Sequence, residues 1–122
     1  MLCGIQLGLL RNEPWKKTIQ TFFELQREFP LKACELHLDA CLFEAAFWPW
    51  DVDVEDEVIA SLRGAVKKLG VHMPFIDMNP ISANPRIAGA SKKMLEASLR
   101  FAAMVEADYV VFHAREIGRA HV

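Results

Sequence analysis

The chain has 122 residues, which is enough for one domain or for part of a larger one. Hydrophobic residues make up 52% of it, so it can bury a core and does not belong to the disordered class. With 14 basic and 16 acidic residues and a net charge of −2, it lacks the cationic surplus that binds a phosphate backbone, which argues against a nucleic-acid partner.

The cysteines and the apolar runs indicate the cellular compartment. Cys3, Cys34 and Cys41 are odd in number and have no C-x-x-C spacing, so we expect neither a disulfide framework nor a structural zinc site. No segment resembles a signal peptide, and no apolar run is long enough to span a bilayer. We therefore expect a cytoplasmic protein that does not contact a membrane.

A strand over residues 2–10 and a helix after it open the predicted fold. The strand is a short apolar run. Asn12 and Pro14 are typical of a helix start, with Asn as the cap and Pro in the first turn. We expect Pro30 to end this helix, because the residue before a proline avoids the helical region.

The second predicted strand, residues 33–39, has one polar face. Glu35, His37 and Asp39 alternate with apolar residues in a period of two. In an open parallel sheet covered by helices on both faces, this polar face would be costly to bury. In a barrel it can point into the interior near the mouth, where polar groups meet a substrate.

A second helix and a third strand follow. Asp53 is the expected helix cap, residues 67–68 are basic and suit its last turn, and Gly70 suits the position just past its end. The third strand then starts at Val71 and reaches a histidine at once. A buried histidine needs polar partners, because burying an imidazole without them costs free energy.

The third helix and the fourth strand complete the predicted order. Asn84 and Pro85 again read as cap and first turn, and the helix runs to about Glu106. The residues expected on its apolar side are Ile87, Met94, Ser98, Phe101, Ala102 and Val105. The fourth strand spans residues 108–113 and ends in a histidine. The order is β-α-β-α-β-α-β, and right-handed crossovers make the strands parallel neighbours.

Two architectures accept this order: a doubly wound open sheet and the first half of a TIM barrel. The first needs a glycine-rich phosphate loop after strand one, and residues 8–12 do not match one. The barrel places active-site groups at the carboxyl ends of strands, where Asp39, Asp77 and His113 fall. We therefore predict an α/β fold with a parallel βαβαβαβ order, the first half of a (β/α)8 barrel truncated after strand four.

Residues 116–122 fit no pattern set by the rest of the chain. Glu-Ile-Gly-Arg-Ala-His-Val resembles the translation of a sequencing adapter. We expect natural sequence to end near Arg115, which makes residues 1–115 the half barrel and removes His121 from the candidate ligands.

The third and fourth strands carry a resemblance to a known family. Gly-Val-His-Met-Pro-Phe-Ile-Asp-Met-Asn-Pro (70–80) and Tyr-Val-Val-Phe-His-Ala (109–114) resemble the xylose isomerase-like TIM-barrel superfamily. This family holds sugar-phosphate isomerases, epimerases and the endonuclease IV type of apurinic-site nuclease (AP endonuclease family 2). The resemblance covers residues 1–115 and implies that His72 and His113 contribute to a metal site. It also implies that the other ligands and the catalytic base come from later strands.

The remaining candidates have polar or aromatic side chains near the expected strand ends. The substrate-binding candidates are His37, Asp39, Trp48, Asp77 and Asn79. Each also has a structural interpretation. The two histidines of the third and second strands can belong to a hydrogen-bonded core network, Asp77 and Asn79 can shape a loop, and Trp48 can pack.

Neutral imidazoles suit a divalent metal ion, and carboxylate ligands broaden the choice toward manganese and magnesium, so the expected cofactor is zinc, manganese, cobalt or magnesium. Such an ion can act as a Lewis acid on a sugar. The resemblance thus favours a metal-dependent sugar or sugar-phosphate isomerase or epimerase. The alternatives are an apurinic-site phosphodiester hydrolase, and a catalytically inactive half barrel whose open sheet edges lead to self-association.

Overall fold

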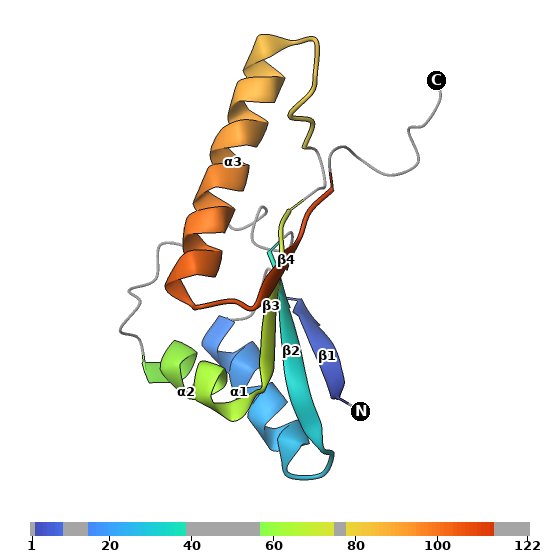
Figure 1. Ribbon diagram of the computed structural model, residues 1–122, viewed down its shortest axis with the longest axis vertical. Helices are drawn as coiled ribbons and strands as arrows, with labels where there is room; N and C mark the ends of the chain where they lie inside the picture. The colour runs from blue at the N-terminus through green and yellow to red at the C-terminus, as the bar shows by residue number, and fades with distance from the viewer. Residues whose placement is uncertain (1, 9–14, 39–56, 75–77, 114–122) are drawn as a thin grey trace.

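Four parallel strands in chain order form the sheet of this protein (Figure 1). The computed structural model describes residues 2–8, 15–38, 57–74 and 78–113. The elements in these residues are β1 (Cys3–Gly8), α1 (Trp15–Gln26), β2 (Leu31–His37), α2 (Glu57–Ala65), β3 (Lys68–His72), α3 (Pro85–Met104) and β4 (Tyr109–Val111). The order β1-β2-β3-β4 with parallel pairing throughout confirms the predicted half barrel.

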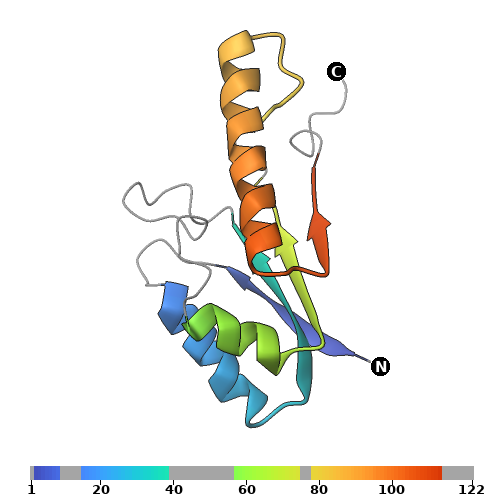
Figure 2. The same cartoon turned by 60° about the vertical axis from the view of Figure 1, so that its left-hand side comes forward.

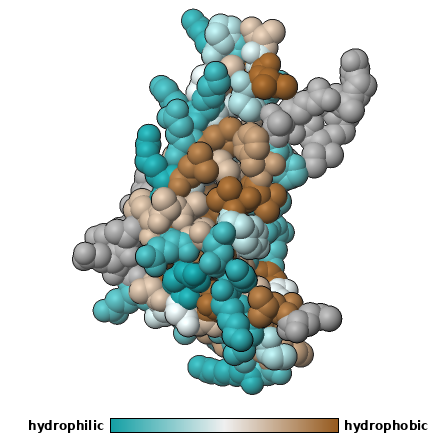
Figure 3. Space-filling view, viewed as in Figure 1, coloured by the Kyte–Doolittle hydropathy of each residue, from teal (hydrophilic) through white to brown (hydrophobic). Residues whose placement is uncertain are grey.

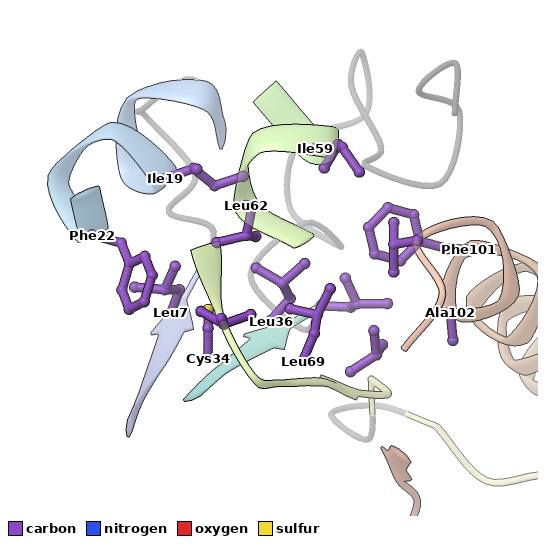
Figure 4. Packing of buried hydrophobic residues seen from close by; sticks show 14 of the residues in the cluster. Leu7, Ile19, Phe22, Cys34, Leu36, Ile59, Leu62, Leu69, Phe101 and Ala102 are labelled. Atoms are coloured by element: carbon purple, nitrogen blue, oxygen red, sulfur yellow. The ribbon is translucent and has the colours of Figure 1, made fainter. Parts of the chain in front are cut away.

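The helices cover one face of the sheet. Figures 1 and 2 show α1 and α2 packed side by side, and α3 beside β3 and β4. Phe22 of α1, Leu62 of α2 and Phe101 of α3 belong to one buried cluster together with Leu36 and Leu69 of the sheet (Figure 4). Since side chains alternate between the faces of a strand, the other face is free to carry polar groups, and in a closed barrel it is the interior.

The strand β2 shows this alternation directly. Cys34, Leu36 and Leu38 are buried under the helices. Glu35 and His37 are only partly buried and belong to the opposite face. The polar face predicted for this strand is therefore confirmed for Glu35 and His37.

The boundary between α2 and β3 differs from the prediction. The helix ends at Ala65, so Lys67 and Lys68 are not in its last turn, and Gly70 is not just past its end. The strand instead begins at Lys68, because this residue already pairs with Ala33 of β2. The histidine predicted at the start of the third strand is consequently the last residue of β3.

The other helices start and end close to the predicted positions. The side chain of Asn84 accepts a hydrogen bond from the backbone N–H of Arg86 at 3.0 Å, which confirms it as the cap of α3. Of the residues predicted for the apolar side of α3, Ser98, Phe101 and Ala102 are buried, whereas the prediction for Ile87 is wrong because it is 45% exposed. Within the described ranges, no helix is both long and apolar enough to cross a membrane.

Candidate functional site

The site lies on the face of the sheet opposite the helices, at the carboxyl ends of the strands. The register pairs Gly8 with His37, His37 with His72, and His72 with Val111. This row holds the last residue of each strand. His113 follows two residues after β4 and therefore continues on the same face.

Three histidines, His37, His72 and His113, form what is here named the histidine cluster. The Nε2 atoms of His72 and His113 are 3.1 Å apart, and the two rings are stacked with centroids 5.2 Å apart. The ring of His37 lies on the other side, with its centroid 4.3 Å from that of His72. His72 is thus the central member of the cluster.

A second row of residues lies two positions earlier along the strands than the row that ends in His37 and His72. Register pairs Gln6 with Glu35, Glu35 with Gly70, and Gly70 with Tyr109. We name these four residues the Glu35 layer. They come from all four strands and share the face that carries the histidines.

Glu35 is the centre of its layer. Its Oε2 accepts a hydrogen bond from the side-chain amide of Gln6 at 2.7 Å and lies 3.1 Å from Nδ1 of His72. Its Oε1 accepts a hydrogen bond from the hydroxyl of Tyr109 at 3.1 Å. The carboxylate therefore connects three strands to the central histidine.

The charge of Glu35 is stabilised by these contacts. Partial burial alone raises the pKa of its carboxyl group, but hydrogen bonds with His72, Gln6 and Tyr109 outweigh this and lower the pKa below its ordinary value. Burial and the neighbouring carboxylate raise the pKa of Tyr109. Glu35 is thus an ionised acceptor and Tyr109 a protonated donor at neutral pH.

Gly70 allows Tyr109 to reach Glu35. A Cβ atom at position 70 would collide with the tip of the Tyr109 ring, which crosses over β3 at this point. The ring therefore occupies the place where β3 would otherwise carry a side chain. Gly70 is needed for this close approach and not for a helix end.

Two solved structures share this arrangement of elements. The TTHB071 protein from Thermus thermophilus, studied after soaking with ZnCl2, matches with a TM-score of 0.62 and 26% identity over 93% of this chain and 40% of that chain. A D-tagatose 3-epimerase-like protein matches with a TM-score of 0.58 and 19% identity over 93% of this chain and 39% of that chain.

The chain therefore shares the fold of these two proteins, which agrees with its resemblance to the xylose isomerase-like TIM-barrel superfamily. Its four parallel strands correspond to the first half of such a barrel. Protein-family profiles and curated protein sequences provide no match.

The structure brings the two predicted metal ligands of this half barrel together. His72 and His113 face each other through Nε2, and His37 is in ring contact with His72. Asn79 lies in the turn before α3, where its side chain accepts from the backbone N–H of Ile81 at 3.2 Å. This contact is the loop-shaping interaction that was the alternative to substrate binding. The other predicted site residues, Asp39, Trp48 and Asp77, lie outside the described residues.

The described part of the chain contains two converging nitrogen donors but no complete metal site. Among those residues no group of three or more His, Cys, Asp or Glu side chains has the geometry to hold an ion.

Cys34 is close in sequence to the Glu35 layer, but its side chain faces the helices. Burial, together with the charge of Glu35, raises the pKa of its thiol to about 12, so it remains a protonated apolar side chain.

Sequence reasoning missed Gln6 and Tyr109 and did not assign Glu35 a specific contact. One signal for Gln6 was present, because it is the only polar side chain of β1 and interrupts an otherwise apolar strand. Tyr109 begins an apolar strand, where an aromatic residue gives no sign of its hydrogen bond.

Proposed function

We propose that this half barrel supplies two metal-binding histidines to a metal-dependent sugar or sugar-phosphate isomerase or epimerase. The observation that carries the proposal is the convergence of Nε2 of His72, at the end of β3, and Nε2 of His113, just after β4, to 3.1 Å. Active sites of TIM barrels lie at this end of the strands. The chain spans 40% and 39% of the solved chains it matches, so the activity is proposed for a complete barrel that contains it.

The two histidines fit a divalent metal ion by their chemistry and their spacing. Imidazole nitrogens bind zinc at about 2.0–2.1 Å, and two nitrogens on a tetrahedral ion are therefore about 3.3 Å apart. The observed separation of 3.1 Å is close to this value. Imidazole ligands suit zinc, cobalt and manganese better than magnesium, which prefers oxygen.

The metal and the protein would contribute different parts of the chemistry. A bound ion would polarise a carbonyl or hydroxyl oxygen of the sugar. In this chain, His72 and His113 would hold the ion, and the histidine cluster would form one wall of the substrate site. We expect the carboxylate base that moves the proton to come from the later strands.

Two further observations support a sugar substrate. One of the structural neighbours is described as D-tagatose 3-epimerase-like. The chain also carries 16 acidic against 14 basic residues, whereas a DNA phosphodiester hydrolase needs a basic surface.

Zinc binding by the chain is the first test. We expect the wild-type chain to bind zinc in isothermal titration calorimetry, and His72→Ala and His113→Ala each to remove this binding because each loses one of two converging donors. His121→Ala is the matched control, since position 121 belongs to the predicted non-native segment. Equal zinc affinity in all four proteins would contradict the proposed metal site.

Activity is tested on a complete barrel that contains this chain. We expect epimerisation or isomerisation of a ketose or ketose phosphate in a substrate panel, and loss of turnover in His72→Ala. Duplex DNA with one apurinic site belongs in the same panel. Strand cleavage without any sugar turnover would replace the isomerase proposal by the hydrolase alternative.

A further inference from the structure

We propose that Glu35 is a positioning residue that holds His72 in one tautomer, with the proton on Nδ1 and the lone pair on Nε2. Gln6 and Tyr109 in turn hold the carboxylate. The inference rests on the proposed function, because it concerns the donor atom that His72 would present to a metal. The tautomer itself can be measured without any metal.

The contact of His72 Nδ1 with the carboxylate of Glu35 favours the protonated nitrogen. Nδ1 lies 3.1 Å from an oxygen of the Glu35 carboxylate and 3.2 Å from the amide nitrogen of Gln6. If Nδ1 carried a lone pair, that lone pair would face an anionic oxygen. With a proton on Nδ1, the same contact becomes a charge-assisted hydrogen bond, which is roughly twice as strong as a neutral one.

The amide nitrogen of Gln6 could donate to a lone pair on Nδ1, but that neutral contact is weaker than the charge-assisted one with the carboxylate. The same nitrogen donates to Glu35 Oε2 at 2.7 Å, which is the shorter of its two contacts. Turning the amide over would place its oxygen against the carboxylate, so the observed orientation is the favourable one. Gln6 therefore fixes Glu35 and leaves the His72 proton to the carboxylate.

Only a carboxylate can accept from Gln6 and Tyr109 of the layer and from His72 at the same time. Oε2 of Glu35 is the acceptor for Gln6 and His72, and Oε1 accepts a hydrogen bond from Tyr109. A glutamine at position 35 has one acceptor oxygen, and its amide group would face at least one of these donors. Glu35→Gln therefore keeps the shape of the side chain and removes the property on which the inference depends.

The tautomer of His72 determines which atom faces His113. With the proton on Nδ1, the lone pair of Nε2 points to Nε2 of His113, 3.1 Å away. In the metal-free chain His113 can then donate its own Nε2 proton across this distance. A histidine ligand of a metal usually has its other nitrogen fixed by such a carboxylate, and loss of that partner costs about 10–100-fold in affinity.

The experiment records the tautomer of His72 in the 15N-labelled, metal-free chain from imidazole 15N chemical shifts. We expect the Nδ1-protonated form in the wild type. Glu35→Gln should show a mixture or the Nε2-protonated form and should bind zinc about 10–100-fold more weakly. Glu96→Gln, which neutralises an exposed carboxylate on α3, is the matched control and should change neither value.

The outcomes separate this inference from the proposed function. If the wild type binds zinc through His72 but Glu35→Gln leaves the tautomer and affinity unchanged, the positioning role is overturned and the metal site stands. If Glu35→Gln changes the tautomer but no variant binds zinc, the positioning role stands and the metal site fails. If Glu35→Gln does not fold, the wild-type spectrum decides, since an Nε2-protonated His72 there overturns the inference.

Discussion

Two glycines of the sheet allow close approach of a neighbouring strand, which is made by backbone atoms at Gly4 and by a side chain at Gly70. A Cβ atom at Gly4 would meet the backbone oxygen of Ala33 at 2.6 Å, and neither strand can move away without disturbing their pairing. A Cβ atom at Gly70 would meet only the far end of the Tyr109 side chain. That side chain is 42% exposed, so it can swing into solvent. The same substitution should therefore have different consequences at the two sites.

Gly70→Ala should remove the hydrogen bond between Tyr109 and Glu35 while costing about 1 kcal/mol or less, the net contribution of one such bond. Gly4→Ala should cost about 1–3 kcal/mol, as expected for overpacking against fixed atoms. Urea unfolding measures both values. Gly89→Ala is the control, because nothing lies within 4 Å of a Cβ at that helical position, and it should stabilise the chain slightly.

A double-mutant cycle checks the reason for the Gly70 effect. Tyr109→Phe removes the hydroxyl but keeps the ring. Once Gly70→Ala has displaced that ring, the hydroxyl has no bond left to lose, so the double variant should match Gly70→Ala in stability. Additive losses would mean that the ring stays in place and that Gly70 does not control it.

The candidate site could be predicted only in part at this scale. His72 and His113 were visible because a polar residue in an apolar strand is conspicuous. The contacts of Glu35 with Gln6 and Tyr109 join residues 29 and 74 positions apart, and they depend on strand register. Register is a property of paired strands, so no single stretch of sequence shows it.

At the scale of elements, Asp108 joins α2, β3 and β4. Its backbone N–H donates to the carbonyl of Leu69 at 2.7 Å, and its carboxylate accepts from the N–H of Leu69 at 2.8 Å. Arg63 of α2 forms an ion pair with the same carboxylate at 3.2 Å. Asp108 thus starts the pairing of the short strand β4 with β3.

These contacts predict a pH dependence of stability. The backbone hydrogen bond from Leu69, assisted by the charges of Arg63 and Lys68 against some desolvation, lowers the pKa of Asp108 below its ordinary value of 3.8. Because the folded pKa is the lower one, the carboxylate stabilises the fold fully above about pH 3.8 and loses this effect as the pH falls through the folded pKa.

Asp108→Asn keeps an acceptor oxygen for Leu69 and removes the charge. We expect the wild type to be more stable than this variant at neutral pH, and the difference to shrink as the pH falls below the ordinary pKa of an aspartate. Thermal unfolding over a series of pH values measures the difference. Other carboxylates, including Glu35, titrate in both proteins, so their contributions cancel in the difference in stability. A difference that does not change with pH would contradict the role of the charge.

The order of the elements was predicted correctly, and their boundaries less well. The error at α2 arose because Lys67, Lys68 and Gly70 together imitate a helix end. The competing pattern was also present. Lys68, Gly70 and His72 alternate with apolar residues that the structure buries, which is the period of a strand.

At the scale of the whole molecule, β1 and β4 are the outer strands of the described sheet, and each pairs with one neighbour. Figure 3 shows an apolar area over the region of α3 and β4. Val110 in β4 is 41% exposed, and Phe112 just after it is 51% exposed. An apolar strand with free hydrogen-bonding groups along one side is a template for another chain.

We therefore expect the isolated chain to self-associate at micromolar concentration, as measured by size-exclusion chromatography with light scattering. A Val110→Lys, Phe112→Lys double variant should shift it toward the monomer, because lysines protect a sheet edge. Ile81→Lys is the control, since this equally apolar residue is 68% exposed but lies in the turn before α3. A monomeric wild type with one sharp unfolding transition would contradict this prediction.

The crossing of the Tyr109 ring over Gly70 has a consequence for how this protein can diverge. Two positions on neighbouring strands share the space of a single side chain, so neither can drift independently of the other. A lineage that acquires a bulky residue at position 70 must displace the aromatic ring at position 109 and so loses one of the anchors of Glu35. The two positions should therefore be inherited as a pair.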